Sequence, residues 1–304
     1  MLLAAMGAIA FSGKAIIVKL AYRYQVDAVT LIMYRMLFAL PLFMLMAWWA
    51  TYRQRGGRAV ALTRRDWVGI FGLGFSGYYL ASFLDFAGLQ YISASLERLM
   101  LYLTPTLVLG LGWVLYGRSA RRGQVWGMGI SYLGVLLVFG HEVRLDGGNV
   151  ALGALLVFLS AISYALYLSY SGELVQRLGS LRLAGLATSV ACLLCLLQFV
   201  VLRPWSATQV APEVIWLSLL NATLCTAVPV LLVMMAIERI GASATAQTGM
   251  VGPMSTILMG VLILGEPFTA WVGVGTALVI AGIFVFSQSQ RTPTQEKRAN
   301  SQWS

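Results

Sequence analysis

Apolar runs of about 20 residues recur from one end of the sequence to the other, separated by short polar stretches. A helix rises about 1.5 Å per residue, so such a run covers the roughly 30 Å hydrocarbon core of a bilayer. Backbone N–H and C=O groups find no water there, and only helices or closed barrels cross it. Because barrel strands are short and alternate in polarity, the long runs predict an all-α membrane protein with about ten transmembrane helices. These helices are expected at residues 2–21, 29–50, 67–88, 93–114, 123–140, 150–170, 182–202, 213–236, 243–264 and 269–287.

The composition is that of a chain embedded in lipid. Of the 304 residues, 59% are hydrophobic and only 11% are charged, whereas soluble domains carry about 25% charged residues. In a soluble protein the formal net charge of +10 would raise the question of nucleic acid. Here the basic residues lie in short loops between apolar runs, where they determine membrane topology. We therefore expect the lipid bilayer as a partner, and no nucleic acid.

Lysine and arginine are concentrated in alternate loops, which is the pattern that fixes orientation in a membrane. The richer loops and the C-terminal tail contain Arg53, Arg55, Arg58, Arg64, Arg65, Arg118, Arg121, Arg122, Arg177, Arg182, Arg239, Arg291, Lys297 and Arg298. The opposite loops contain only Arg23, Arg144 and Arg203. Because basic loops stay in the cytoplasm, both termini are expected there, in agreement with an even number of spans. The polar tail at residues 289–304 is expected to be disordered.

The second half of the sequence repeats the first. With a shift of 148 residues, YISASLERLMLYLTPTLVLGLGWVLYG aligns with RIGASATAQTGMVGPMSTILMGVLILG without a gap. Proline and glycine fall in register, in the pairs Pro105/Pro253, Gly112/Gly260, Gly117/Gly265, Gly127/Gly275 and Gly134/Gly282. This predicts two repeats, residues 2–140 and 150–287, each with five helices. Since five is odd, the second repeat enters the membrane from the opposite side, and inverted repeats are a common plan of secondary transporters.

The duplicated segments resemble the EamA-type branch of the drug/metabolite transporter superfamily. The resemblance rests on ISAS…TPTLVLGLGWVLYG and IGASATAQ…GPMSTILMGVLILGEPFT, and it covers residues 2–287. It implies a carrier of the bacterial inner membrane, often an exporter of amino acids, metabolites or drugs. One position departs from the duplication, because Gly265-Glu266 in the second half corresponds to Gly117-Arg118 in the first.

Five ionisable residues of the first half lie inside expected spans, where each costs roughly 2.5–3.5 kcal/mol to insert. They are Lys14, Arg35, Asp85, Glu97 and Arg98. The corresponding residues of the second half are Ile162, Leu183, Val233, Thr245 and Ala246. A charge that the scaffold itself needed should have been kept in both halves. The asymmetry therefore favours a functional role.

Two interpretations of these charges stay open. In the first, Lys14, Arg35 and Arg98 neutralise Asp85 and Glu97 in a network that holds the helices together. In the second, Glu97 or Asp85 takes up and releases a coupling proton, while Lys14 or Arg98 binds an anionic group of the substrate. Adjacent residues on a helix point about 100° apart and cannot share one direction, so Glu97 and Arg98 are each expected to pair with a residue on another helix than their own. For Arg35, snorkelling toward the membrane surface is a third interpretation.

Tyrosines and prolines on the same spans are further candidates. Tyr78, Tyr79 and Tyr102 are expected either to line a substrate cavity or to serve in packing and in an interfacial aromatic belt. Pro105 and Pro253 occupy matching places in two spans, and each frees a backbone carbonyl and permits a helix kink. Interruptions at matching places of two halves point toward a binding site, with simple bending as the alternative.

Residues for other chemistries are missing from the sequence. No phosphate-binding loop is present, which excludes an ATP-driven pump made of this chain alone. His141 is the single histidine, so we expect no metal site, no Ser/His/Asp set and hence no enzyme. No cofactor is expected either.

The balance of embedded charges indicates the kind of substrate. The three cations outnumber the two carboxylates, and a buried unpaired cation is costly, so an anionic group on the substrate would complete the balance. We therefore expect a secondary carrier, working as an exporter, for a small zwitterionic or anionic molecule such as an amino acid, with Lys14 as the main contact. A multidrug exporter of lipophilic cations, a channel-like or structural membrane subunit, and a membrane enzyme acting on lipid are the alternatives.

Overall fold

The computed structural model describes residues 2–55, 60–116, 122–146, 149–233, 235–236 and 251–291, and this part of the chain is helical with no β-strand. Its elements are α1 (Leu2–Tyr22), α2 (Ala28–Arg55), α3 (Arg64–Leu73), η1 (Gly74–Leu80), α4 (Ala81–Leu89), α5 (Ala94–Leu101), α6 (Thr104–Tyr116), α7 (Arg122–Asp146), α8 (Asn149–Leu178), α9 (Ser180–Leu202), η2 (Trp205–Thr208), α10 (Pro212–Ala222), η3 (Thr223–Ala227), α12 (Val251–Met259), η4 (Gly260–Leu264) and α13 (Ala270–Arg291). Most of the expected disordered tail, residues 292–304, lies outside the described residues.

Eight helices of the described chain are long and apolar enough to cross a membrane. They are Leu2–Tyr22, Ala28–Arg53, Arg64–Leu89, Arg122–Arg144, Asn149–Gly172, Ser180–Leu202, Pro212–Val233 and Ala270–Gln288. The fourth expected span is formed by α5 and α6, which a turn at Tyr102 and Leu103 separates. The ninth is described from Val251 onward, as α12 and η4. The expected all-α membrane protein is confirmed.

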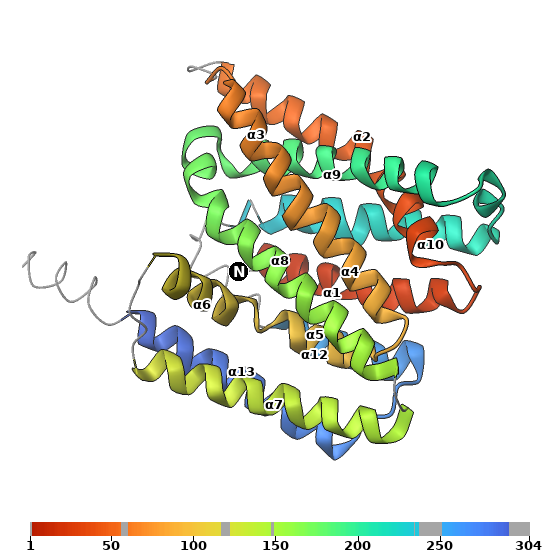
Figure 1. Cartoon of the computed structure of the whole chain (residues 1–304), viewed down its shortest axis with the longest axis vertical. Helices are drawn as coiled ribbons and strands as arrows, with labels where there is room; N and C mark the ends of the chain where they lie inside the picture. Colours follow the sequence, from red (N-terminus) through yellow and green to blue (C-terminus); the bar gives the residue numbers. More distant parts are fainter. Residues whose placement is uncertain are drawn as a thin grey trace, which may run out of the picture.

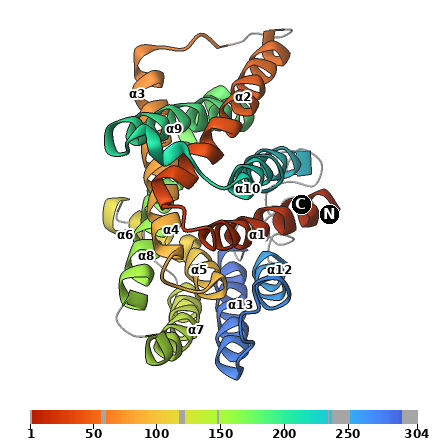
Figure 2. The same cartoon turned by 90° about the vertical axis from the view of Figure 1, so that its right-hand side faces the viewer.

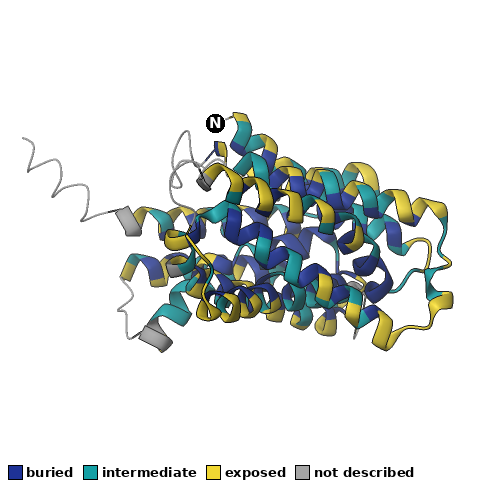
Figure 3. Cartoon of the chain, turned by 90° about the horizontal axis from the view of Figure 1, so that it is seen from above, coloured by how far each residue is buried: buried dark blue, intermediate teal, exposed yellow. Residues whose placement is uncertain are grey.

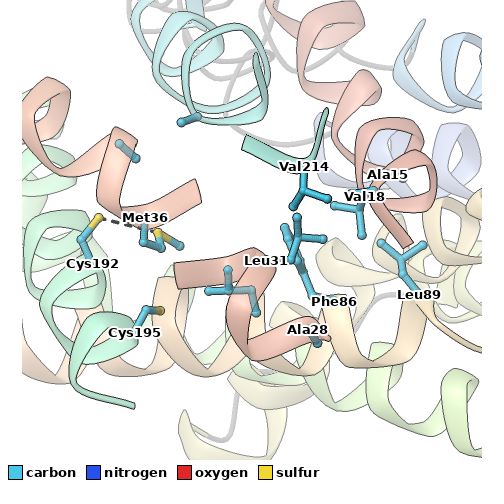
Figure 4. Packing of buried hydrophobic residues seen from close by; sticks show 14 of the residues in the cluster. Ala15, Val18, Ala28, Leu31, Met36, Phe86, Leu89, Cys192, Cys195 and Val214 are labelled. Carbon is cyan, nitrogen blue, oxygen red and sulfur yellow. Dashed lines mark hydrogen bonds between the residues drawn. The ribbon is translucent and has the colours of Figure 1, made fainter. Parts of the chain in front are cut away.

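Burial follows the requirements of a bilayer. Exposed residues lie along the outward faces of the bundle and buried ones fill its interior (Figure 3). Many outward residues are large and apolar, as in Trp48 (63% exposed) and Leu197 (59% exposed), and lipid tails can cover them at no cost in desolvation. The main interior cluster joins both halves of the chain, because Val18, Leu31, Phe86 and Val214 from α1, α2, α4 and α10 pack together (Figure 4).

The inversion of the two repeats is visible where α7 packs against α13, along one edge of the bundle (Figures 1 and 2). A Cβ atom added at Gly127 would lie 2.6 Å from the carbonyl oxygen of Gly282, and one at Gly134 would lie 2.6 Å from that of Gly275. Gly127 corresponds to Gly275 in the duplication and Gly134 to Gly282. Corresponding residues thus exchange partners, as a two-fold axis requires. The residue number rises along one helix as it falls along the other, so the two helices are antiparallel.

Spans 3 and 8 share a feature that the sequence did not indicate. Each contains a π-helical segment, η1 in the first half and η3 in the second, and the two lie at matching positions of the duplication. Such segments free backbone carbonyls and occur often at functional sites. In the first half, two hydroxyls of α8 donate hydrogen bonds to carbonyls in and just after η1. Ser160 donates to the Ala81 carbonyl and Ser163 to the Ser76 carbonyl, both at 2.7 Å.

The short helix α5 begins with a regular cap. Ser93 has an extended backbone, and its hydroxyl oxygen accepts a hydrogen bond from the backbone N–H of Leu96 at 3.0 Å. At the other end, α6 begins at Thr104, so Pro105 lies in a first helical turn, where its missing N–H costs no hydrogen bond. The interruption leaves α5 as a separate half-helix that carries Glu97 and Arg98. The corresponding Pro253 lies in α12, which the structure describes from Val251 onward.

Candidate functional site

Three of the predicted charges meet in the interior. Lys14 Nζ of α1 lies 2.5 Å from Asp85 Oδ2 of α4 and 3.3 Å from Glu97 Oε1 of α5. Their side chains are 8%, 3% and 0% exposed. This triad joins three helices that pack side by side near the centre of the bundle (Figure 2). With all three groups ionised it carries one net negative charge.

The carboxylates of the triad keep unused hydrogen-bonding capacity. Asp85 Oδ1 and both oxygens of Glu97 are buried and have no hydrogen-bond partner among the described residues. A buried unsatisfied polar group costs about 1–3 kcal/mol, and a charged one more. A proton or a donor group of a ligand would satisfy these oxygens.

Arg98 has neutral neighbours. Its Nη2 donates to the hydroxyl of Ser12 at 2.7 Å, and that hydroxyl contacts the carbonyl oxygen of Gly252 in α12 at 2.9 Å. The guanidinium lies over the rings of Phe11 and Tyr102, at 5.3 and 5.9 Å from their centroids. Although Arg98 is only 5% exposed, its Nε has no hydrogen-bond partner among the described residues, and none of their carboxylates forms an ion pair with it. A buried guanidinium with an aromatic surround is suited to an anionic group.

Arg35 is a second buried cation that forms no ion pair among the described residues. It is 6% exposed, which places it inside the protein and argues against snorkelling. Its Nε donates to Thr226 Oγ1 of η3 at 3.3 Å, and its guanidinium lies 5.0 Å from the ring centroid of Phe86. Nη1 has no partner in the part of the chain that the structure describes.

The three candidate tyrosines lie in different places. Tyr102 is next to the Arg98 guanidinium, and a Cβ added at Gly252 would lie 2.6 Å from its hydroxyl oxygen. Tyr78 of η1 packs against α8 and α9, where its hydroxyl lies 3.3 Å from that of Tyr167. Tyr79 packs beside Phe75 with ring centroids 5.4 Å apart. Only Tyr102 is brought into contact with the charges, so it is the tyrosine that the geometry favours as a substrate contact.

Ser12 and Gly252 are site residues that sequence reasoning missed. Neither type stands out in an apolar helix. Ser12 accepts a hydrogen bond from Arg98 and donates one to the carbonyl of Gly252, and this second bond links the two halves of the chain. Charged residues were easier to find because each is conspicuous in an apolar run. No signal in the sequence marks the two uncharged ones.

These features define a class, the multi-pass α-helical membrane proteins built from two inverted repeats around buried charges. Comparison with known families agrees, since the model of the EamA-like transporter family matches residues 1–140 and again residues 151–288. The chain belongs to this family.

Its relatives carry transporter names. The chain is 30% identical over 270 residues to the uncharacterized transporter YcbK of Bacillus subtilis, covering 86% of this chain and 83% of the relative. An uncharacterized transporter of Archaeoglobus fulgidus is 21% identical, with 95% and 97% covered. A solved crystal structure shares the fold, with a TM-score of 0.62 at 17% identity, over 93% of this chain and 94% of that one. The protein is therefore a membrane transporter.

Proposed function

We propose that this transporter is a secondary carrier that exports a small zwitterionic or anionic metabolite, such as an amino acid, across the bacterial inner membrane. It works by alternating access of its two halves, residues 2–140 and 150–287, with both termini in the cytoplasm. Glu97 and Asp85 carry a coupling proton. The observation that carries the proposal is the position of Arg98, a buried cation between the two halves with no described carboxylate to neutralise it.

The energies favour Arg98 over Lys14 as the contact for the substrate. Removing one partner of a buried ion pair costs about 3–5 kcal/mol, and Lys14 holds two carboxylates at once. Among the described residues, Arg98 would give up its hydrogen bond to the Ser12 hydroxyl but no ion pair, and hydrogen bonds involving a charged group contribute roughly 1.5–3 kcal/mol. Binding an anion at Arg98 therefore breaks contacts of lower free energy than binding an anion at Lys14.

The triad supplies a means of coupling. Lys14 lies on α1, whereas Asp85 and Glu97 lie on α4 and α5, so the ion pairs hold these helices together. Protonation of Glu97 removes one of the two attractions and loosens the contact between α1 and α5. Proton release and substrate binding then favour different arrangements of the helices, which is the requirement for coupled transport.

A binding screen tests this proposal. Thermal unfolding of the purified protein is measured with amino acids, simple carboxylates and lipophilic cationic dyes, because a ligand of the folded state raises the melting temperature. We expect stabilisation by a member of the first two groups. In Arg98→Gln the ligand's affinity should fall by about tenfold to hundredfold, the effect of losing a charged hydrogen bond.

Arg35→Gln is the matched control, since it removes another buried cation outside the proposed contact, and it should retain more of the affinity. Tight binding of cationic dyes that Arg98→Gln leaves unchanged would contradict the proposal and favour a multidrug exporter.

A further inference from the structure

The Gly-Glu-Pro turn after η4 reaches from the second half of the chain to the first. Gly265 has φ of 73°, in the left-handed region that glycine adopts without strain. The backbone N–H of Glu266 then donates to the carbonyl of Gly260 at 3.1 Å, which closes the turn. This geometry directs the Glu266 side chain back toward α5.

The Glu266 carboxylate binds the N-terminus of α5. Its Oε1 accepts a hydrogen bond from the backbone N–H of Ala94 at 2.8 Å, and its Oε2 accepts one from the hydroxyl of Ser95 at 3.0 Å. Free N–H groups and the helix dipole make a helix N-terminus favourable for a negative charge. A Cβ at Gly260 would lie 2.9 Å from Oε2, so a larger residue there would shift the carboxylate from this position.

A second carboxylate binds the same helix end from within the first half. Glu142 of α7 is 8% exposed, and it accepts hydrogen bonds from the hydroxyl of Ser93 and, at 3.2 Å, from the backbone N–H of Ser93. Each of the two carboxylates accepts hydrogen bonds from one backbone N–H and one serine hydroxyl, but they come from different halves of the chain. Glu142 joins α5 to its own repeat, whereas Glu266 joins α5 to the other repeat.

Neighbouring contacts close the same end of the bundle. Arg23, just after α1, donates to the carbonyl of Leu264 at 3.0 Å, and the hydroxyl of Tyr22 donates to the carbonyl of Phe86 at 2.6 Å. By the distribution of basic residues this end is the external one. Among these contacts, only that of Glu266 brings a full negative charge from one half to a helix end of the other.

We propose that Glu266 is a positioning residue for transport, a latch that holds the external side of α5 closed over Glu97 and Arg98 and that releases when the substrate leaves outward. This inference rests on the proposed carrier function. α5 carries both site residues, so moving its N-terminus moves the site. In the sequence, Arg118 stands in the first half at the position that corresponds to Glu266, and a cation cannot accept hydrogen bonds from a helix N-terminus.

The latch can be tested without a substrate. Ala21 is fully buried in the last turn of α1, in the core cluster that also contains Phe86 and Ala94. In a variant without native cysteines, Ala21→Cys is labelled on intact cells with a membrane-impermeant maleimide. We expect Glu266→Ala to increase the labelling rate by about tenfold, which corresponds to the loss of a charged hydrogen bond of roughly 1.4 kcal/mol.

Glu142→Ala is the matched control, because it removes a carboxylate from the same helix end without separating the halves. Labelling in this variant should stay close to that of the parent, and Gly260→Ala, which keeps the carboxylate but disturbs its seat, should fall between. Equal increases in both Glu variants would show that capping of α5 alone matters, and unchanged labelling in Glu266→Ala would show that the latch does not exist. Either result overturns the inference. Because no substrate is used, failure of the proposed carrier function would appear separately, in the binding screen.

Discussion

Among individual residues, Glu97 and Asp85 differ in how firmly they are held. Asp85 Oδ2 lies 2.5 Å from Lys14 Nζ, whereas the nearest oxygen of Glu97 lies 3.3 Å away, and neither Glu97 oxygen makes a hydrogen bond within the described residues. A fully buried carboxylate with one long ion pair is the one whose charged form is least supported. Glu97 is therefore the better candidate for the coupling proton.

Glu97→Gln should fold and reach the membrane, because an amide of the same shape replaces a weakly held carboxylate. It should lose transport driven by a proton gradient while it still exchanges substrate on the two sides of the membrane. Transport is compared at external pH values from about 5 to about 8, so that the proton gradient across the membrane is varied. Normal gradient-driven transport would contradict proton coupling at this residue, and a variant that fails to fold would favour the structural network.

The individual charges could be predicted from the sequence, but their pairing could not. Lys14, Asp85 and Glu97 stood out because each is ionisable in an apolar run. That Lys14 binds both carboxylates, and that Arg98 binds neither, depends on how α1, α4 and α5 pack. The sequence expectation of Lys14 as the main substrate contact followed from the count of charges, whereas our proposal gives that role to Arg98 because Lys14 already pairs with two carboxylates.

At the scale of elements, close helix packing and irregular helices position the site. The duplication predicted matching glycines in α7 and α13, and the structure shows why they match, since they let the two helices touch backbone to backbone. The π segments η1 and η3 had no local signal, because a π turn arises from one extra residue in an otherwise ordinary apolar helix. The partners of Glu266 were equally hidden, as Ala94 and Ser95 lie 172 and 171 residues earlier in the chain.

The contact between α7 and α13 predicts a sharp difference between neighbouring glycines. A Cβ at Gly127 would lie 2.6 Å from a backbone oxygen of α13, whereas one at Gly129 has nothing within 4 Å. Gly127→Ala should therefore destabilise the protein by about 1–3 kcal/mol, the usual cost of overpacking. Gly129→Ala should be neutral or stabilising by up to about 1 kcal/mol, because alanine favours a helix. Thermal unfolding in detergent measures both, and equal stability of the two variants would contradict the packing described.

For the whole molecule, the arrangement of basic loops predicts the topology. Reporter proteins fused after Gly57 and at the C-terminus should read cytoplasmic, and one fused after Gly147 should read external. All three sites lie outside the described residues, so the prediction rests on the charges and on the number of spans. A cytoplasmic signal at Gly147 would contradict both the orientation and the assignment of the latch to the external side.

The central claim is that the two inverted halves form a carrier whose buried charges bind the substrate, and counterflow tests it most directly. The protein is placed in liposomes loaded with the ligand found in the binding screen, and entry of the labelled ligand is followed. A carrier must reorient, so preloading should accelerate entry and the rate should saturate, and in Arg98→Gln both effects should need about tenfold to hundredfold more ligand. A rate of entry that is the same with and without preloading, and that rises with ligand concentration without saturating, would show a channel and contradict the account.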